Sequence, residues 1–168
     1  MTKATTRGIL LFRWRYILLP LAIFFLSILL SAYFYHLLPT DVAYHFKSDG
    51  SADRWLSREM IIVWTLMPQI LFTLVAGCLT WGITRLSILF GQAESTRIKP
   101  EGVLLLIGNM IVLPQVILCF AMLDIFSYNS YQIHIMPLWL FALIIMVLGG
   151  IILGVLFMRI FQQVWRAG

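Results

Sequence analysis

Four long stretches of this sequence contain no Asp, Glu, Lys or Arg, and this absence limits the possible folds more than any other feature. An α-helix needs about 20 mostly apolar residues to cross the hydrocarbon core of a bilayer. The four stretches meet that length and predict transmembrane helices at about 16–38, 60–84, 102–123 and 135–158. The composition agrees, since 61% of the residues are hydrophobic and 11% are charged. We therefore expect an all-α membrane protein, a four-transmembrane-helix bundle that forms one integral domain over residues 1–168 in the lipid bilayer.

The basic residues lie mostly at one end of the expected helices. Loops rich in Lys and Arg are retained on the cytoplasmic side of a membrane. One side holds most of them: Lys3, Arg7, Arg13, Arg15, Arg85, Arg97, Lys99, Arg159 and Arg166. The other side holds Lys47, Arg54 and Arg58, which neighbouring acidic residues offset. Both termini are therefore expected in the cytoplasm, with residues 39–59 and 124–134 outside. The net charge of +5 is explained by this insertion signal, and no soluble basic face predicts nucleic-acid binding.

Two of the expected helices carry a Pro-Gln pair at a similar depth. Pro68 precedes Gln69 and Pro114 precedes Gln115, and the helical rise places the prolines roughly 12 and 14 Å from the outer helix ends. A functional interpretation is a polar site made of the two amides and of carbonyls that the prolines leave without a partner. The favoured interpretation is hydrogen bonding between helices, which holds the helices together. Asn109 in the third helix is interpreted in the same way.

The fourth expected helix contains small residues. Gly150 and Gly154 have the Gly-x-x-x-Gly spacing that lets a second helix approach closely. The partner is either another helix of the same chain, which is favoured, or a second copy of the chain. A homo-oligomer through Gly150 and Gly154 therefore stays open.

Residues 39–59, which we call the hook, form the longest polar interruption among the apolar stretches. Val42, Tyr44 and Phe46 alternate with other residues, and a period of two predicts a short strand. The segment 48–51, Ser-Asp-Gly-Ser, is typical of a tight turn. Ser57 is placed to cap the second helix, with Glu59 in its first turn. The hook is therefore expected to be a short folded element.

His45 is the residue of the hook that is most open to interpretation. It either pairs with Asp53 or turn amides and holds the hook shut, which is favoured, or recognises an external ligand, or binds a divalent metal. The spacing of the acidic residues and histidines matches no strong metal signature. No nucleophile with an oriented base is evident either, so the sequence predicts no enzyme, no cofactor and no metal site.

The hook carries a resemblance to a known family. The residues concerned are Leu38, Pro39, Val42, His45, Phe46, Gly50, Asp53, Trp55, Ser57 and Arg58. Over about residues 17–66 the chain resembles the membrane domain of unknown function numbered 1648, as found in the SdpI family of bacterial immunity proteins. It departs from the motif of that family at Ala43, Lys47, Leu56 and Arg58. Residues 85–168 show no such resemblance.

The resemblance implies a bacterial plasma-membrane protein that protects its host from a membrane-active peptide toxin. It also implies a regulatory protein as a partner at the cytoplasmic face, which the loop at 85–99 would meet. The binding or structural residues of the hook are then Pro39, His45, Phe46, Gly50, Asp53, Trp55 and Arg58. An alternative of a different class is a structural subunit or small-molecule permease that uses the level of Gln69 and Gln115.

Overall fold

The computed structural model describes residues 14–47, 51–90 and 100–165. Gly50 of the hook and the basic residues at 3, 7, 13, 97, 99 and 166 lie outside these ranges. The chain is mostly helical, as predicted. The elements in order are η1 (Trp14–Tyr16), α1 (Leu18–Phe34), β1 (Asp41–Phe46), β2 (Ala52–Ser57), α2 (Arg58–Phe90), α3 (Pro100–Met110), α4 (Val112–Tyr131) and α5 (Leu138–Trp165).

Three helical spans in the described residues are long and apolar enough to cross a membrane, by length and composition. These are Arg58–Arg85, Leu104–Tyr131 and Leu138–Arg159. Helix α1, Leu18–Phe34, is a shorter apolar helix. The chain therefore has the features of a membrane protein.

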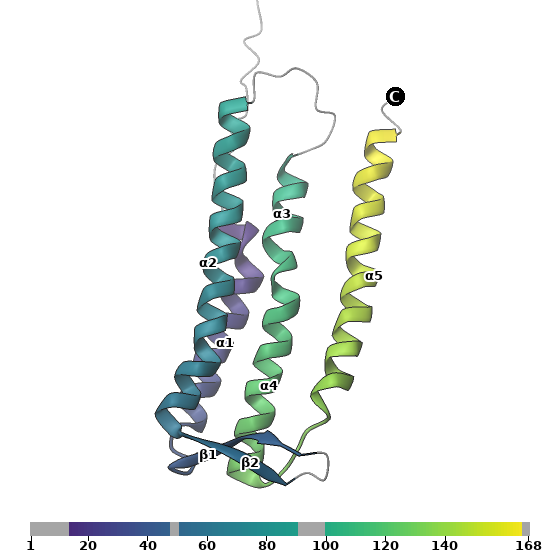
Figure 1. Ribbon diagram of the computed structural model, residues 1–168. Coiled ribbons are helices and arrows are strands. Elements are labelled where there is room, and N and C mark those ends of the chain that lie inside the picture. The colour runs from purple at the N-terminus through teal and green to yellow at the C-terminus, as the bar shows by residue number, and fades with distance from the viewer. Residues whose placement is uncertain (1–13, 48–50, 91–99, 166–168) are drawn as a thin grey trace, which may run out of the picture.

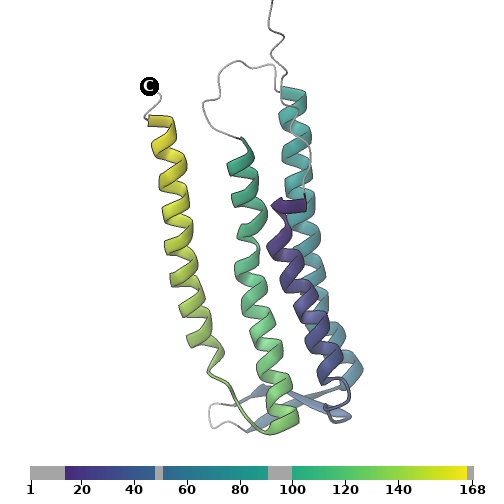
Figure 2. The same cartoon turned by 180° about the vertical axis from the view of Figure 1, so that it is seen from behind.

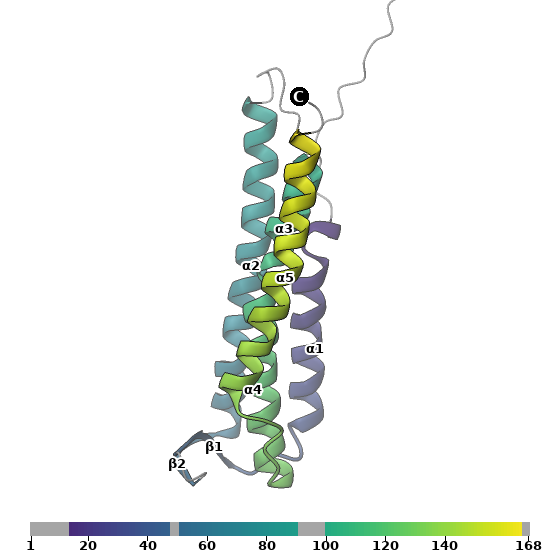
Figure 3. The ribbon, with the colours of Figure 1, turned by 90° about the vertical axis from the view of Figure 1, so that its right-hand side faces the viewer.

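The helices run side by side, and the two strands lie across one end of them (Figures 1 and 2). Helices α1, α2, α3 and α4 pack on one another, whereas α5 lies along the other side of α3 and α4. The C-terminal end of α5 and the strands lie at opposite ends of the molecule (Figure 1). Viewed from the side, α5 lies in front of α4 and between α1 and α2 (Figure 3).

Helix α1 is shorter at both ends than the stretch 16–38 predicted. It begins after Ile17, whose φ of −125° is not helical, and ends at Phe34. The residue before a proline is disfavoured in the helical conformation, so Pro39 prevents the helix from reaching Leu38. The chain turns after Phe34, and the Leu38 N–H donates back to the Phe34 carbonyl at 2.9 Å. The apolar stretch is therefore longer than the helix because its last residues form a turn that packs inward.

The third predicted helix, 102–123, is wrong at its outer end and is interrupted. The helix is interrupted at Ile111, between α3 and α4. Pro114 has no N–H to donate to the carbonyl four residues before it, at Met110, which accounts for the break there. Helix α4 then continues beyond the apolar stretch to Tyr131 and ends at Gln132, which has a positive φ of 58°. Most of the predicted outer loop 124–134 is therefore helix.

Helix α2 extends beyond both ends of the predicted 60–84, whereas α5 begins three residues after the predicted 135 and extends beyond 158. Helix α2 covers Arg58–Phe90 and stays continuous through Pro68, whereas α5 covers Leu138–Trp165. The backbone hydrogen bonds of a helix continue through residues with polar side chains, so the helix ends set by hydropathy fall short of the true ends at these positions.

The principal cluster of buried apolar side chains lies at the strand end of the molecule. It joins the end of α1, the strands, the start of α2 and the middle of α4. Its members are Phe34, Leu38, Val42, Ile61, Cys119, Met122 and Phe126. Val42 and Phe126 have no exposed surface. This cluster fixes how the chain leaves α1 and enters α2, and therefore positions the strands.

Candidate functional site

Strands β1 and β2 form an antiparallel hairpin with an irregular register. Ala43 faces Trp55, but the next pair is His45 with Arg54, and the one after is Phe46 with Ala52. Tyr44 and Asp53 therefore have no direct cross-strand partner. Such bulges bend a strand and redirect its side chains. The strand predicted from Val42, Tyr44 and Phe46 is present as β1, whereas β2 was not predicted.

His45 and Asp53 pair across the hairpin, as the favoured interpretation expected. His45 Nδ1 donates to Asp53 Oδ1 at 2.6 Å. This hydrogen bond lowers the pKa of the Asp53 carboxyl below its ordinary value of 3.8, and the positive charges of Arg54 and Lys47 act in the same direction. The His45 side chain remains 56% exposed. The pair therefore closes the hairpin and leaves the imidazole ring accessible from outside.

Asn129, near the end of α4, fastens the hairpin to the helices. The Ala43 N–H donates to Asn129 Oδ1, and Asn129 Nδ2 donates to the Ala43 carbonyl, both at 2.8 Å. Both groups of Ala43 therefore point to the outer edge of β1, away from β2. The side-chain amide takes the place of a neighbouring strand. A two-stranded hairpin alone is marginally stable in water, so this attachment stabilises it.

A group of stacked rings forms a second contact between the hairpin and α4. The centroid of the Phe46 ring lies 4.6 Å from that of Tyr128 and 4.7 Å from that of His134. The rings of Tyr128 and His134 stack with their centroids 4.4 Å apart. Asp124 fixes His134, whose Nδ1 donates to Oδ2 at 3.1 Å, and Oδ1 accepts the Ile135 N–H at 2.8 Å. Phe46 is therefore held by packing on α4 and by the segment that leads to α5.

The start of α2 is fixed by Ser57 and Arg58. The Met60 N–H donates to the Ser57 hydroxyl at 3.4 Å, which confirms the predicted cap. The Arg58 guanidinium lies 4.6 Å over the Tyr35 ring and donates to the Tyr35 carbonyl at 3.4 Å. A cation at the C-terminal end of α1 also suits the helix dipole. Arg58 therefore joins α1 to α2.

The remaining predicted hook residues differ in position. Pro39 is exposed in the turn between α1 and β1. Trp55 on β2 is 55% exposed. Gly50 lies outside the described residues, so its predicted place in the turn is not described. The structure thus groups His45, Phe46, Asp53 and Trp55 on the hairpin and gives Arg58 a role at the helix junction.

The acidic residues and histidines of this end form two separate pairs, His45 with Asp53 and His134 with Asp124. Within residues 14–47, 51–90 and 100–165, no three His, Cys, Asp or Glu side chains come together as metal ligands would.

Gln69 and Gln115 meet, as their shared depth indicated. Gln69 Nε2 donates to the Gln115 carbonyl at 3.0 Å, and Gln115 Nε2 donates to the Gln69 carbonyl at 3.3 Å and to Thr73 Oγ1 at 3.0 Å. Both Gln side chains are completely buried. Their Oε1 atoms have no hydrogen-bond partner in the described part of the chain.

Asn109 links α3 to the start of α1. Its Oδ1 accepts the Leu19 N–H at 3.3 Å, and its Nδ2 donates to the Leu105 carbonyl at 2.8 Å. The first N–H groups of a helix lack partners within the helix. Asn109 therefore supplies from another helix the cap that Ile17 does not provide.

Sequence reasoning missed Asn129 and Tyr128 because it placed 124–134 in a loop. A signal was present: Asp124, Tyr128 and Tyr131 recur at helical spacing after the apolar stretch ends. Extending the helix by about two turns would have placed Asn129 beside the hook.

Comparison with known families agrees with the resemblance read from the hook. Residues 22–68 match the family described as a domain of unknown function (DUF1648). The match runs from α1 through the hairpin into α2, close to the predicted 17–66. No curated protein and no solved structure matches the chain.

Proposed function

We propose that this chain, which carries a DUF1648 domain, is a non-enzymatic multi-pass protein of the bacterial plasma membrane that resembles the SdpI immunity proteins. Its helices form a four-helix bundle with both termini in the cytoplasm. The hairpin faces outward and meets a membrane-active peptide toxin, and a regulatory protein binds at the cytoplasmic face.

One observation carries this proposal: the hairpin is held rigidly and yet presents accessible side chains. Asn129 and the ring group around Phe46 fix it to α4. His45 and Trp55 remain more than half exposed. Tryptophan contributes large contact area at low entropic cost, which suits a recognition surface. A rigid hairpin also binds a partner without first having to become ordered.

The test is the survival of sensitive bacteria that express the chain and are challenged with peptides secreted by its source strain. Protection is expected, and Trp55→Ala is expected to remove most of it. The matched control is Trp139→Ala at the start of α5, which removes a Trp that is 70% exposed but lies outside the hairpin. Equal loss in both variants, with equal amounts in the membrane, would contradict a role for the hairpin surface.

A second candidate function rests on the glutamine level. Two completely buried amides whose Oε1 atoms have no partner among the described residues are the expected feature of a structural subunit or small-molecule permease with an internal polar site. The experiment measures solute flux through the Trp55→Ala variant and through the double variant Gln69→Leu and Gln115→Leu. Solute flux that survives the double variant would exclude the permease.

A further inference from the structure

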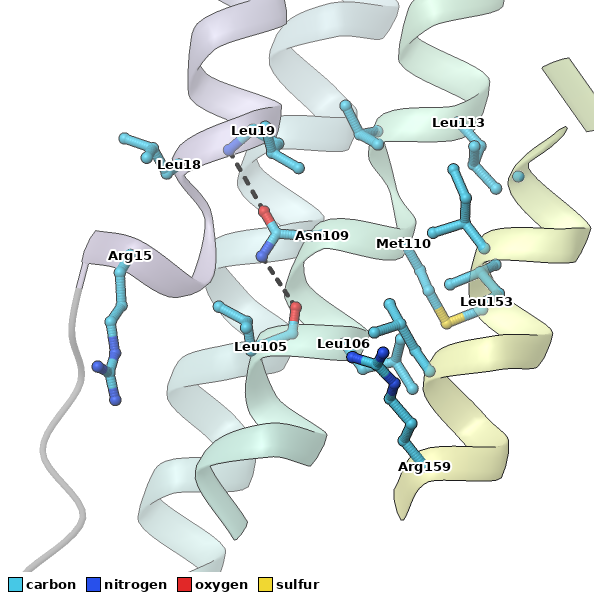
Figure 4. A pocket seen from close by; sticks show the side chains of 14 residues that line it. Arg15, Leu18, Leu19, Leu105, Leu106, Asn109, Met110, Leu113, Leu153 and Arg159 are labelled. Carbon is cyan, nitrogen blue, oxygen red and sulfur yellow. Dashed lines mark hydrogen bonds between the residues drawn. The ribbon is translucent and has the colours of Figure 1, made fainter. Parts of the chain in front are cut away.

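A cavity of about 600 Å³ lies between the start of α1, the α3–α4 pair and α5 (Figure 4). This volume is within the range of roughly 300–1,000 Å³ of sites that hold small organic ligands. Its walls are mainly leucines: Leu18, Leu19, Leu105, Leu106, Leu113 and Leu153. Helix α2 contributes no lining residue in the described part of the chain. The cavity is therefore distinct from both the hairpin and the glutamine level.

The cavity opens on the flank of the helices. Leu19, Leu105 and Ile152 line it and are 51%, 46% and 59% exposed. In a chain that spans a membrane, such a flank faces the bilayer. An acyl chain that enters from the bilayer displaces no water and gains van der Waals contacts with the leucine walls. A molecule that occupies the cavity therefore comes from the lipid of the bilayer.

Two arginines complete one end of this apolar cavity. Arg15 lines it from η1 and Arg159 from α5, and Figure 4 shows both at the same end, on opposite sides. The residues that line the cavity in the described part of the chain include no Asp or Glu. Guanidinium groups bind phosphate well, and basic pockets between transmembrane helices attract anionic headgroups. The charge of this end is therefore complementary to an anionic lipid.

Two glycines allow the helices around the cavity to pack closely. A Cβ on Gly108 would collide with the Tyr16 carbonyl oxygen, so this glycine lets η1 lie against α3 and positions Arg15. A Cβ on Gly149 would lie 2.5 Å from the Leu113 side chain, so α5 is close to α4 at that point. Toward its C-terminal end α5 leans away from α3, as Figures 1 and 2 both show. Along α5 the lining of the cavity runs from Gly149, where α5 is close to α4, to Arg159.

We infer that this cavity binds an anionic glycerophospholipid, whose phosphate lies between Arg15 and Arg159 and whose acyl chain lies along the leucine wall. The inference goes beyond the proposed function. It requires that the chain spans a bilayer, and it is independent of what the hairpin recognises.

The experiment uses the full chain in mild detergent. It is mixed with equal amounts of palmitoyl-oleoyl-phosphatidylglycerol and palmitoyl-oleoyl-phosphatidylcholine, and the lipid retained per chain is measured by native mass spectrometry. One phosphatidylglycerol is expected per chain, in preference to phosphatidylcholine. The double variant Arg15→Gln and Arg159→Gln is expected to lower its retention by about tenfold or more. The control Arg85→Gln removes an arginine of α2 that does not line the cavity, and is expected to change nothing.

A second variant tests the apolar wall. Leu106→Trp fills the cavity and is expected to expel lipid while the helical circular dichroism stays unchanged. Equal retention of the two lipids by the unaltered chain would overturn the inference, as would unchanged retention in the double arginine variant. A dimer that forms in place of lipid binding would also overturn it, because a second copy would then occupy the cavity.

Discussion

The hairpin end and helix α5 are held by different means. At the hairpin end, Val42 and Phe126 are completely buried, and Asn129 satisfies both backbone groups of Ala43. In the described part of α5, most large apolar side chains are exposed, and only 6% of its most apolar 18-residue stretch is buried. This stretch is also the most apolar of the three described membrane-length spans.

This difference separates two sources of structure. Side chains of the chain itself determine the geometry of the hairpin end, because both strands and the turn between α1 and β1 contact named residues in the described part of the chain. Helix α5 is apolar nearly all round, and a helix of that kind is stable in lipid with few protein contacts. Changes at the hairpin end should therefore alter folding, whereas changes on α5 should alter its contacts with lipid or with a second copy.

The largest effect is expected from Phe126→Ala in the buried cluster. Removal of a completely buried ring leaves a cavity and should lower the free energy of unfolding by about 3–5 kcal/mol. Leu148→Ala on α5, where the side chain is 52% exposed, should change it by less than about 0.5 kcal/mol. Unfolding in detergent mixtures of increasing denaturing strength measures both. Similar losses in the two variants would remove the distinction between the regions.

The next effect is expected from Asn129→Ala. Both hydrogen bonds to Ala43 are lost, so the hairpin should detach from α4 at a cost of about 1–3 kcal/mol. Hydrogen exchange of residues 41–46 should become faster, while exchange in α5 stays the same. Asn129→Asp retains an acceptor for the Ala43 N–H and loses the donor to its carbonyl, so it should also accelerate exchange. Protection equal to that of the unaltered chain would show that the ring group alone holds the hairpin.

The same two regions show which parts of the fold the sequence could predict. Apolar stretches predicted the helices, because twenty residues without charge have few other structures available. The shared level of Gln69 and Gln115 was also predicted, although α4 ends at Tyr131. The depth of Gln115 follows from the end of the apolar stretch near Leu123. The residues of α4 beyond that point lie beside the hairpin, so they do not change this depth.

The sequence could not predict where elements end or what they contact. Hydropathy marks the boundary near Asp124, whereas the helix ends where Gln132 takes a positive φ. Strand β2 was missed because Ala52, Asp53 and Arg54 show no apolar alternation. The His45–Asp53 pair was predicted from chemistry and proximity, but Asn129 lies far from Ala43 in the sequence. Such distant pairs depend on packing and have no local signal.

A smaller effect is expected when the Asp53 carboxylate is protonated. Its pKa lies below the ordinary value of 3.8 in the folded hairpin, so the pair stabilises the hairpin fully above that value. This contribution should be lost as the pH falls below 3.8 through the lower folded pKa. Trp55 emission reports the opening, with Trp55→Phe to identify its share of the signal. Asp53→Asn should remove the acid transition, and a transition that persists in this variant would assign it to another group.

The smallest effect on folding is expected from Gly150→Ala and Gly154→Ala. Apart from neighbouring residues and the backbone of α5 itself, no described atom lies within 4 Å of a Cβ at either position, so a methyl group fits. The higher helix propensity of Ala should stabilise α5 by up to about 1 kcal/mol at each position. Gly149→Ala is the matched opposite, because its Cβ would press on Leu113. Among the described glycines of α5, Gly149 is therefore the one that packs against another helix of the chain. If Gly150 and Gly154 form a contact with a second copy, their alanine variants should lower the dimer fraction in cross-linking without lowering stability. An unchanged fraction would leave this face of α5 to lipid.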